Sequence, residues 1–202
     1  MGLTHKVKPS EDRASDKVLF YMISLYDIDV YLIDWVHTHF QSRLWIKFME
    51  FVSIKQNFAI PGLIVAILIL WVYRWRGALF LVAGGIAIGL NDAISHHVFK
   101  EGIGRLRPCH VLPQLQHVVN CSNSFSFPSN HASNTFAFAM LGTLCFRNWV
   151  LLVYCIALIV GYSRVFLGVH YPSDILGGAA FGSLMGYLGY LLYRQGLQRF
   201  RV

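Results

Sequence analysis

The sequence predicts an all-α fold, a polytopic membrane helical bundle with about five transmembrane helices. Two observations lead to this fold class. Hydrophobic residues make up 55% of the 202 residues and charged residues only 13%, which is well below the charged share of an average soluble domain. Apolar runs that approach the length of a membrane span follow one another along the chain. No repeat or low-complexity linker divides it, so we expect a single integral membrane domain over residues 1–202.

Residues 1–56 are expected to form a polar tail followed by interfacial amphipathic helices. Three aspartates interrupt the apolar residues of the stretch 17–50: Asp27, Asp29 and Asp34. These charges make a lipid-facing span costly, whereas a helix lying in the plane of the interface tolerates them. A sixth span over Lys17–Val36 is the alternative. The first residues contain no cleavage site ahead of an apolar core, so the N-terminus is expected to be retained.

Residues 57–193 are expected to form the transmembrane bundle. Five apolar segments make it up: Asn57–Trp75, Gly77–Phe99, His131–Phe146, Trp149–Phe166 and Ile175–Tyr193. The last segment carries a glycine at every fourth position: Gly178, Gly182 and Gly186. Such a stripe lets another helix approach closely. Packing within the monomer and a dimer face both fit, so the oligomeric state stays open.

Arginines mark one end of this bundle. They lie in the turns between segments and in the basic tail, residues 194–202: Arg74, Arg76, Arg147, Arg194, Arg199 and Arg201. Short Arg-rich ends favour the cytoplasm, so the opposite end is expected to face the periplasm or the cell exterior across an inner (plasma) membrane. These ends also account for the net charge of +7, so nucleic-acid binding is not expected.

Three short polar patches fall at the opposite end of the predicted bundle. The first contains Lys100 and Arg107-Pro108, the second Ser129-Asn130-His131, and the third Ser163-Arg164, His170 and Asp174. Each residue alone has an ordinary interpretation, because a cation at a membrane edge is commonly an anchor. Their joint occurrence at one end of the bundle favours a single site for a phosphate group.

The residue types suit phosphoryl transfer, which needs neutralised oxygens, an in-line nucleophile and a proton for the leaving group. The cations supply the first requirement, and the hydroxyl and backbone N–H groups that precede a helix can face an anion. His131 is placed to donate the proton. Asp174 can reach one ring nitrogen of His170 and leave the other free to attack phosphorus, although Pro172 makes that turn irregular.

Two further features of the polar end leave alternatives open. Cys109 and Cys121 lie in the connection between the second and third segments, where an oxidising compartment predicts a disulfide; two free thiols are the alternative. Asp92 and His96 are spaced as a metal pair, but two ligands do not make a site. A buried polar network of Asn91 and Asp92 that supports the helix end is the preferred interpretation.

The three patches resemble the signature of the type 2 phosphatidic acid phosphatase family, which is related to vanadium haloperoxidases and bacterial acid phosphatases. That signature reads Lys-x6-Arg-Pro, Pro-Ser-Gly-His and Ser-Arg-x5-His-x3-Asp. It stands here at Lys100–Pro108, Pro128–His131 and Ser163–Asp174. The one departure is Asn130, where the family usually has Gly.

The resemblance implies a mechanism without metal or cofactor. His170 would form a phosphohistidine, Asp174 would orient it, and His131 would be the general acid. The phosphate would be held by the remaining motif residues: Lys100, Arg107, Ser129, Asn130 and Arg164. Arg105 is expected either as an outer contact or as a loop charge only.

The predicted function is therefore that of a lipid-phosphate phosphatase. Candidate substrates are undecaprenyl diphosphate, phosphatidic acid, phosphatidylglycerol phosphate and lipid A phosphates, and the sequence does not select among them. A lipid phosphotransferase on the same fold and a non-catalytic binder of phosphorylated lipids are the alternatives. The intact pair of histidines and the aspartate argue against the binder.

Overall fold

The described part of the chain is helical throughout its regular elements. The computed structural model describes residues 13–40, 42–115 and 121–199, and these residues contain no β-strand. The predicted N-terminal tail before residue 13 and the end of the basic tail, residues 200–202, lie outside the described residues. The all-α fold class is confirmed.

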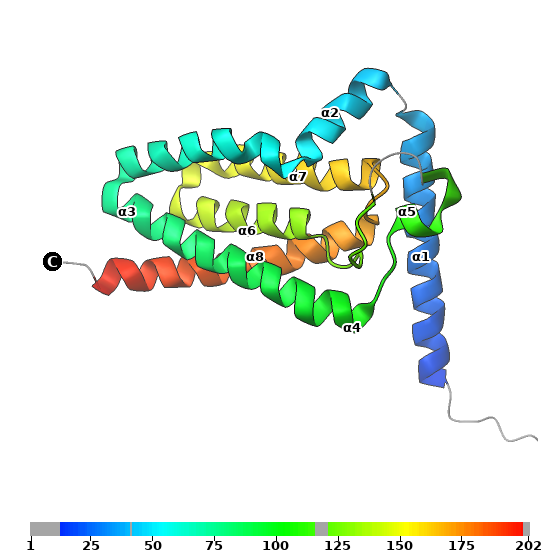
Figure 1. The fold of residues 1–202 in the computed structure, drawn as a ribbon. Coiled ribbons are helices and arrows are strands. Elements are labelled where there is room, and N and C mark those ends of the chain that lie inside the picture. The colour runs from blue at the N-terminus through cyan, green and yellow to red at the C-terminus, as the bar shows by residue number, and fades with distance from the viewer. Residues whose placement is uncertain (1–12, 41, 116–120, 200–202) are drawn as a thin grey trace, which may run out of the picture.

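The first two predicted segments form a helical hairpin. They are joined in one element, α3 (Ala59–Ile94), that is not helical at Arg74, where φ is 51° and ψ is −128°. Figure 1 shows that the two arms of α3 run in opposite directions from this bend. The second arm continues through a π-helical turn, η2 (Ser95–Lys100), and a short helix, α4 (Glu101–Ile103), so it ends a little later than predicted.

The remaining three segments correspond to α6 (Asn130–Cys145), α7 (Val150–Phe166) and α8 (Pro172–Arg199). α6 packs against α3, α7 and α8. Three stretches of the described chain are long and apolar enough to cross a membrane: Lys55–Val111, which holds both arms of α3, Arg147–Phe166 and Pro172–Arg199. α6 has 16 residues and is the shortest of the bundle helices. The predicted membrane bundle is confirmed.

The glycine stripe of α8 lies against the backbone of α6. A Cβ atom added at Gly178 would lie 2.7 Å from the carbonyl oxygen of Ser129. Cβ atoms at Gly182 and Gly186 would collide with the carbonyl oxygens of Ser133 and Ala137. The stripe therefore serves packing within the chain, which is the first of the two uses that the sequence allowed.

The N-terminal region forms two helices, α1 (Arg13–His39) and α2 (Arg43–Ser53). α1 runs across the end of the bundle, roughly at right angles to the bundle helices (Figure 1), and contacts α7 and α8. This orientation agrees with an interfacial helix rather than with a sixth span parallel to the others.

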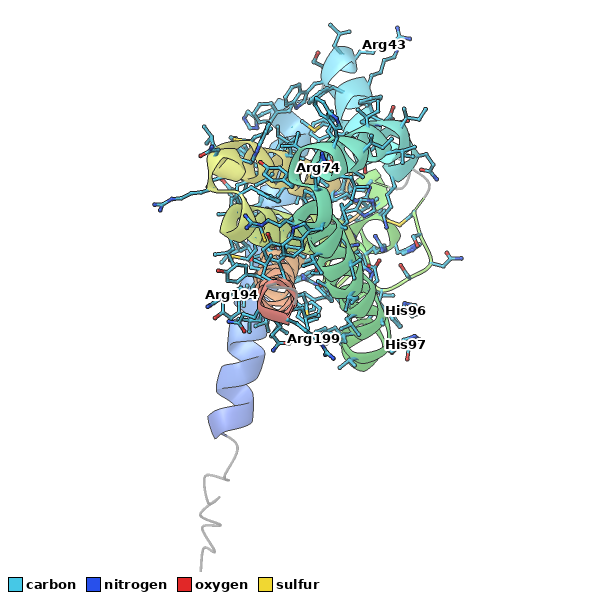
Figure 2. All side chains as sticks on the ribbon, turned by 90° about the vertical axis from the view of Figure 1, so that its left-hand side faces the viewer. Arg43, Arg74, His96, His97, Arg194 and Arg199 are labelled. Carbon is cyan, nitrogen blue, oxygen red and sulfur yellow. A yellow bond between two sulfur atoms is a disulfide. The ribbon has the colours of Figure 1, made fainter. Side chains whose placement is uncertain are left out.

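The polar patches and the arginines lie at opposite ends of the bundle. The bend of α3, the short helix η4 (Arg147–Trp149) before α7 and the end of α8 share one end (Figure 1). Figure 2 looks onto that end, with Arg74, Arg194 and Arg199 around it. The loops that carry the three patches gather at the other end, close to α1.

Candidate active site

His170 lies in the loop between α7 and α8, after a turn at Gly168. Gly168 has a φ of 63°, a left-handed conformation that favours glycine. The turn brings His170 into the interior, where the residue is only 2% exposed. Pro172 then begins α8 and places Asp174 in its first turn, so His170 Nδ1 and Asp174 Oδ2 are 3.4 Å apart.

Donors surround the fully buried carboxylate of Asp174. It accepts hydrogen bonds from the Tyr171 amide at 2.8 Å, from Arg105 Nη1 at 2.8 Å and from the Ser126 hydroxyl. An ionised carboxylate can only accept, so the proton of His170 is assigned to Nδ1, beside Asp174. This tautomer leaves a lone pair on Nε2.

The Nε2 atom of His170 faces the opposite way, toward Arg107. The distance from Arg107 Nη1 to His170 Nε2 is 3.1 Å, and a guanidinium can only donate. Burial lowers the pKa of His170 to about 3, because a desolvated imidazolium is costly, although the hydrogen bond with Asp174 acts in the opposite direction. The ring is therefore neutral at physiological pH, as a nucleophile must be.

Arg107 and Lys100 are buried cations held by the same loop. Both residues are 5% exposed. Arg107 Nε donates to the carbonyl oxygen of Ser124 at 2.7 Å, and its Nη1 donates to that of Val169 at 3.0 Å. Lys100 Nζ donates to the carbonyl oxygen of Phe125 at 3.0 Å. These carbonyl contacts fix the cations without neutralising their charge.

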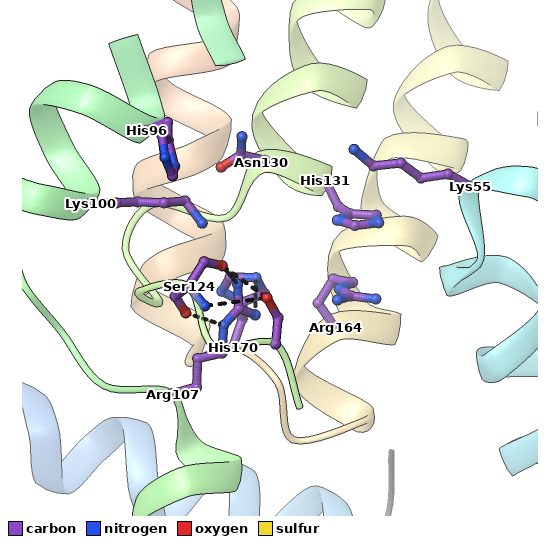
Figure 3. A pocket seen from close by; sticks show the side chains of 10 residues that line it. Lys55, His96, Lys100, Arg107, Ser124, Asn130, His131, Arg164 and His170 are labelled. Carbon is purple, nitrogen blue, oxygen red and sulfur yellow. Dashed lines mark hydrogen bonds between the residues drawn. The ribbon is translucent and has the colours of Figure 1, made fainter. Parts of the chain in front are cut away.

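A cavity of about 240 Å³ lies in front of His170 (Figure 3). Ten residues line it: Lys55, His96, Lys100, Arg107, Ser122, Ser124, Asn130, His131, Arg164 and His170. Among these lining residues are four Lys or Arg side chains and no carboxylate. A concave site with this charge attracts anions.

The side chains predicted for the site line this cavity, except Asp174 and Ser129. Asp174 lies behind His170. Ser129 differs from the expectation that its amide faces an anion, because that amide donates to the carbonyl oxygen of Asp174 at 3.1 Å. The close approach of α8 to the start of α6 causes this. The Ser129 hydroxyl is buried and has no hydrogen-bond partner among the described residues.

Asn130 is bound to the polar network predicted at the end of α3. Its Nδ2 donates to Asp92 Oδ1 at 2.7 Å, and Asn134 Nδ2 donates to the same oxygen at 3.0 Å. Asn91 Nδ2 in turn donates to Asn134 Oδ1 at 2.6 Å. The network joins the second arm of α3 to α6, and it provides a partner for the side chain that replaces the family's Gly.

His96 lines the cavity and is not paired with Asp92. Its Nε2 lies 3.9 Å from Glu101 Oε1, and His97 Nδ1 lies 3.7 Å from the same oxygen. The ligand-type atoms of His96, His97 and Glu101 lie within 4.8 Å of one another, but all three side chains are exposed. Asp92 instead accepts hydrogen bonds from Asn130 and Asn134, in the polar network that the sequence favoured over a metal pair with His96.

Arg105 contacts the site from behind and does not line the cavity. Its Nη1 donates to Asp174 and, at 2.6 Å, to the Ser173 hydroxyl, while Nη2 donates to Asp29 Oδ2 at 2.7 Å. Its guanidinium lies 3.9 Å from the ring centroid of Tyr171. Arg105 is therefore more than a loop charge, but its partners are Asp174, Ser173 and Asp29 rather than the cavity in which a phosphate would lie. Asp29 belongs to α1 and is 2% exposed.

Cys109 and Cys121 form a disulfide, with their Cα atoms 6.2 Å apart. Cys109 lies in the short helix α5 (Pro108–Val111), directly after Arg107. The bridge therefore links the loop of the first patch to the loop that precedes the second.

Several residues of the site lie outside the three motifs and were not predicted. A serine stands at every second position just before the second patch: Ser122, Ser124 and Ser126. In an extended chain this spacing places the three hydroxyl groups on one side, so it could have indicated them. Asp29 has the pattern of a charge in an amphipathic helix, which does not distinguish it from Asp27 and Asp34. Lys55 carried no signal, because a lysine beside an apolar segment is commonly an anchor.

Comparisons with known proteins agree with this geometry. Residues 77–197 match the family model of the PAP2 superfamily. The chain is 30% identical over 179 residues to the lipid A 4'-phosphatase of Bacteroides thetaiotaomicron, a match that covers 83% of this chain and 78% of that protein. It is 33% identical over 145 residues to phosphatidylglycerophosphatase B of Bacillus subtilis, covering 65% of this chain and 66% of that protein.

A solved structure shares the fold. The crystal structure of a transmembrane PAP2 type phosphatidylglycerolphosphate phosphatase from Bacillus subtilis matches with a TM-score of 0.55 and 24% identity. The match covers 89% of this chain and 96% of that chain.

Proposed function

The chain belongs to the PAP2 superfamily, and from this membership and the geometry of the cavity we propose that it removes phosphate from a membrane lipid through a phosphohistidine on His170. It is an integral membrane phosphatase, like the relatives that it matches. One observation carries the proposed mechanism: His170 contacts Asp174 through Nδ1 and directs Nε2 toward a cavity lined by cations.

In the proposed mechanism His170 Nε2 attacks phosphorus in line with the departing oxygen. Asp174 holds the Nδ1–H tautomer and stabilises the charge that develops on the ring. Lys100, Arg107 and Arg164 neutralise the non-bridging oxygens. Water then attacks the phosphohistidine, the phosphorus–nitrogen bond breaks, and inorganic phosphate leaves.

His131 is the proposed general acid for the leaving group. It lies in the first turn of α6 and lines the cavity across from His170 (Figure 3). Burial of the ring disfavours its protonated form most, and the charges of Arg164 and Lys55 add to this effect; a bound phosphate dianion would favour protonation by balancing those cations. The substrate's own charge would thus prepare the acid. Asn130, which lines the cavity at the start of the same helix, and the hydroxyl of Ser129, which has no partner among the described residues, complete the proposed phosphate contacts.

The proposed substrate is a phosphomonoester or diphosphate of a membrane lipid. Relatives are named for lipid A and for phosphatidylglycerol phosphate, and undecaprenyl diphosphate and phosphatidic acid offer the same terminal group. The cavity lies at the end of the membrane bundle, where a lipid headgroup can reach it while the acyl chains stay in the bilayer.

We place the cavity outside the cytoplasm, on the outer side of an inner (plasma) membrane. Two observations support this orientation. The arginines lie at the other end of the bundle, as they do at cytoplasmic ends. The Cys109–Cys121 disulfide lies at the cavity end, and disulfides persist in oxidising compartments.

The test is phosphate release from purified lipid phosphates in nonionic detergent. We expect release from at least one lipid phosphate, with EDTA leaving the rate unchanged. A substrate labelled in its terminal phosphate should give a labelled protein whose label is lost in acid and stable in alkali, as phosphohistidine requires.

Two variants control this test. His170→Ala should lose the label, whereas His97→Ala should keep it, because His97 is exposed and lies outside the cavity lining. Transfer to an added alcohol instead of release would identify a phosphotransferase. Lipid binding without turnover would identify a binding protein, and a chelator-sensitive rate would contradict the metal-free mechanism.

A further inference from the structure

Lys55 brings a fourth cation to the cavity from outside the three motifs. It begins η1 (Lys55–Phe58), the short helix that joins α2 to α3, and its side chain lines the cavity. The residue also lies outside the stretch 77–197 that matches the superfamily model. Its ammonium group has no hydrogen bond or ion pair with the residues that the structure describes.

The segment that carries Lys55 is fixed against the site. Arg164 Nη1 donates to the hydroxyl of Ser53, two residues before Lys55. Two residues after it, Asn57 Nδ2 donates to the carbonyl oxygen of Phe51 at 2.8 Å and holds the turn. Lys55 is therefore positioned by its flanking residues, and its place at the cavity does not depend on a bond of its own.

Lys55 lies on the side of the cavity where a leaving group would depart. Figure 3 shows its side chain ending beside His131, across the cavity from His170 and Arg107. In phosphoryl transfer the nucleophile and the leaving group occupy opposite sides of phosphorus. With His170 as nucleophile, the departing oxygen points toward the wall formed by His131 and Lys55.

The two residues on this wall would serve different leaving groups. An alcohol leaves as a neutral molecule once an acid has protonated it, so His131 suffices for a lipid monophosphate. A phosphate leaving group, as in a lipid diphosphate, departs with negative charge. A cation beside it stabilises that charge in the transition state.

We propose that Lys55 binds the leaving phosphate and makes the site selective for lipid diphosphates over lipid monophosphates. This inference rests on the proposed function. In the step, a bond forms between His170 Nε2 and the terminal phosphorus while the bond from that phosphorus to the bridging oxygen breaks. The electron pair goes to the bridging oxygen of the departing lipid monophosphate, whose charge Lys55 meets. Water then releases the terminal phosphate from His170.

The competing interpretation is an ordinary anchor that binds phosphates of the bilayer surface. Lys47 on α2 provides the matched control, because it is an exposed lysine of the same region and does not line the cavity. Lys47→Gln removes one positive charge from the surface, as Lys55→Gln does, but it leaves the lining of the cavity unchanged.

The experiment compares farnesyl diphosphate with farnesyl phosphate in nonionic detergent, because the two substrates share one chain and differ by one phosphate. We expect Lys55→Gln to lower the ratio of kcat/KM for the diphosphate to that for the monophosphate by about 10- to 100-fold, the effect of one lost charged hydrogen bond. Lys55→Arg should restore most of the ratio, and Lys47→Gln should leave it at the wild-type value.

Binding provides a readout that does not depend on turnover. Calorimetric titration with inorganic pyrophosphate and with orthophosphate should show that Lys55→Gln weakens pyrophosphate at least about tenfold more than orthophosphate. Equal losses for both anions and both farnesyl substrates would make Lys55 a contact of the scissile phosphate, and no loss would make it an anchor. Either result overturns the proposed selectivity. If wild type turned over neither farnesyl substrate, the ratio of anion affinities would decide the role of Lys55, and phosphate release from the purified lipid phosphates would decide the proposed function separately.

Discussion

The two sides of His170 differ in how their charges are matched. On the Asp174 side, every charged group has an opposite charge in contact: Asp174 and Asp29 both bind Arg105, which also stacks on Tyr171. On the cavity side, four cations face one another without a carboxylate among the lining residues. One side is a closed hydrogen-bond network, and the other is an unbalanced positive surface.

This difference separates two tasks of a phosphoryl-transfer site. A nucleophile must be held in one tautomer and one orientation, and matched, buried partners achieve this because leaving any of them unpaired is costly. A phosphate site must instead keep its cations available, because their charge is needed most in the transition state. Arg105 and Arg164 illustrate the contrast. Arg105 contacts two carboxylates, whereas Arg164 contacts the neutral hydroxyl of Ser53 and its Nε has no partner among the described residues.

The largest loss of turnover is expected from changing His170, which lies between the Asp174 side and the cavity side. His170→Ala should reduce turnover by about 10³-fold or more on every substrate, because it removes the proposed nucleophile. Phosphate release measures this loss on a lipid phosphate and on nitrophenyl phosphate. An unchanged thermal unfolding midpoint would confirm folding, and a folded variant that kept a few per cent of activity would contradict the assignment.

The next effect tests the cavity side alone. His131→Ala should lower turnover of a lipid monophosphate by about 10²- to 10⁴-fold, because an alkoxide departs poorly without a proton. The loss on nitrophenyl phosphate should be much smaller, because nitrophenolate needs little protonation. The ratio of the two rates is the measurement. Equal losses on both substrates would make His131 a phosphate ligand and not the acid.

A smaller effect is expected from breaking the closed network at its far end. Asp29→Asn removes one of the two carboxylates on Arg105, so that Arg105 should pull on Asp174 and shift His170 out of line. We expect kcat to fall about tenfold with KM nearly unchanged, since the cavity cations are untouched. The measurements are the separate changes in kcat and in KM, together with the pH profile of kcat, because a positioning role alters kcat and leaves KM nearly unchanged.

Asp27→Asn is the matched control, because Asp27 is an exposed carboxylate of α1 two residues away. It should leave both kinetic constants near the wild-type values. A rise in KM with unchanged kcat in Asp29→Asn would show instead that α1 binds substrate.

The last prediction concerns stability, and here the smallest effect on rate is expected. The change is in the packing between the helix of the Asp174 side and a helix of the cavity side. Gly182→Ala places a methyl group against the carbonyl oxygen of Ser133, between α8, which carries Asp174, and α6, which carries His131. Overpacking of this kind costs about 1–3 kcal/mol of stability. Thermal unfolding measures it, with Gly85→Ala as control because a Cβ there meets nothing within 4 Å. An unchanged midpoint would contradict the tight packing of α6 and α8.

Much of the fold was predictable from local pattern. The apolar segments and the arginine-rich turns depend on composition over neighbouring residues, so their helices and their alternation between the two ends were predicted, and the membrane bundle is confirmed. The bounds were less accurate at the polar end of α3, where the π-helical turn and Gly104 end the helix. The single-domain organisation and the roles of the site residues stay predictions.

The three motifs contain the proposed nucleophile, the carboxylate beside it and three of the four cavity cations, because the fold brings the separate parts of the signature to one place. Folding alone revealed that Asp29 of α1 reaches Arg105, that Ser126 binds Asp174, and that Lys55 enters the cavity from a segment 45 residues before Lys100. These contacts join residues far apart in the chain, and they depend on how helices pack rather than on any local pattern. The sequence therefore determined which groups are proposed to do the chemistry, and the packing of α1, α2 and α8 decided which groups hold and surround them.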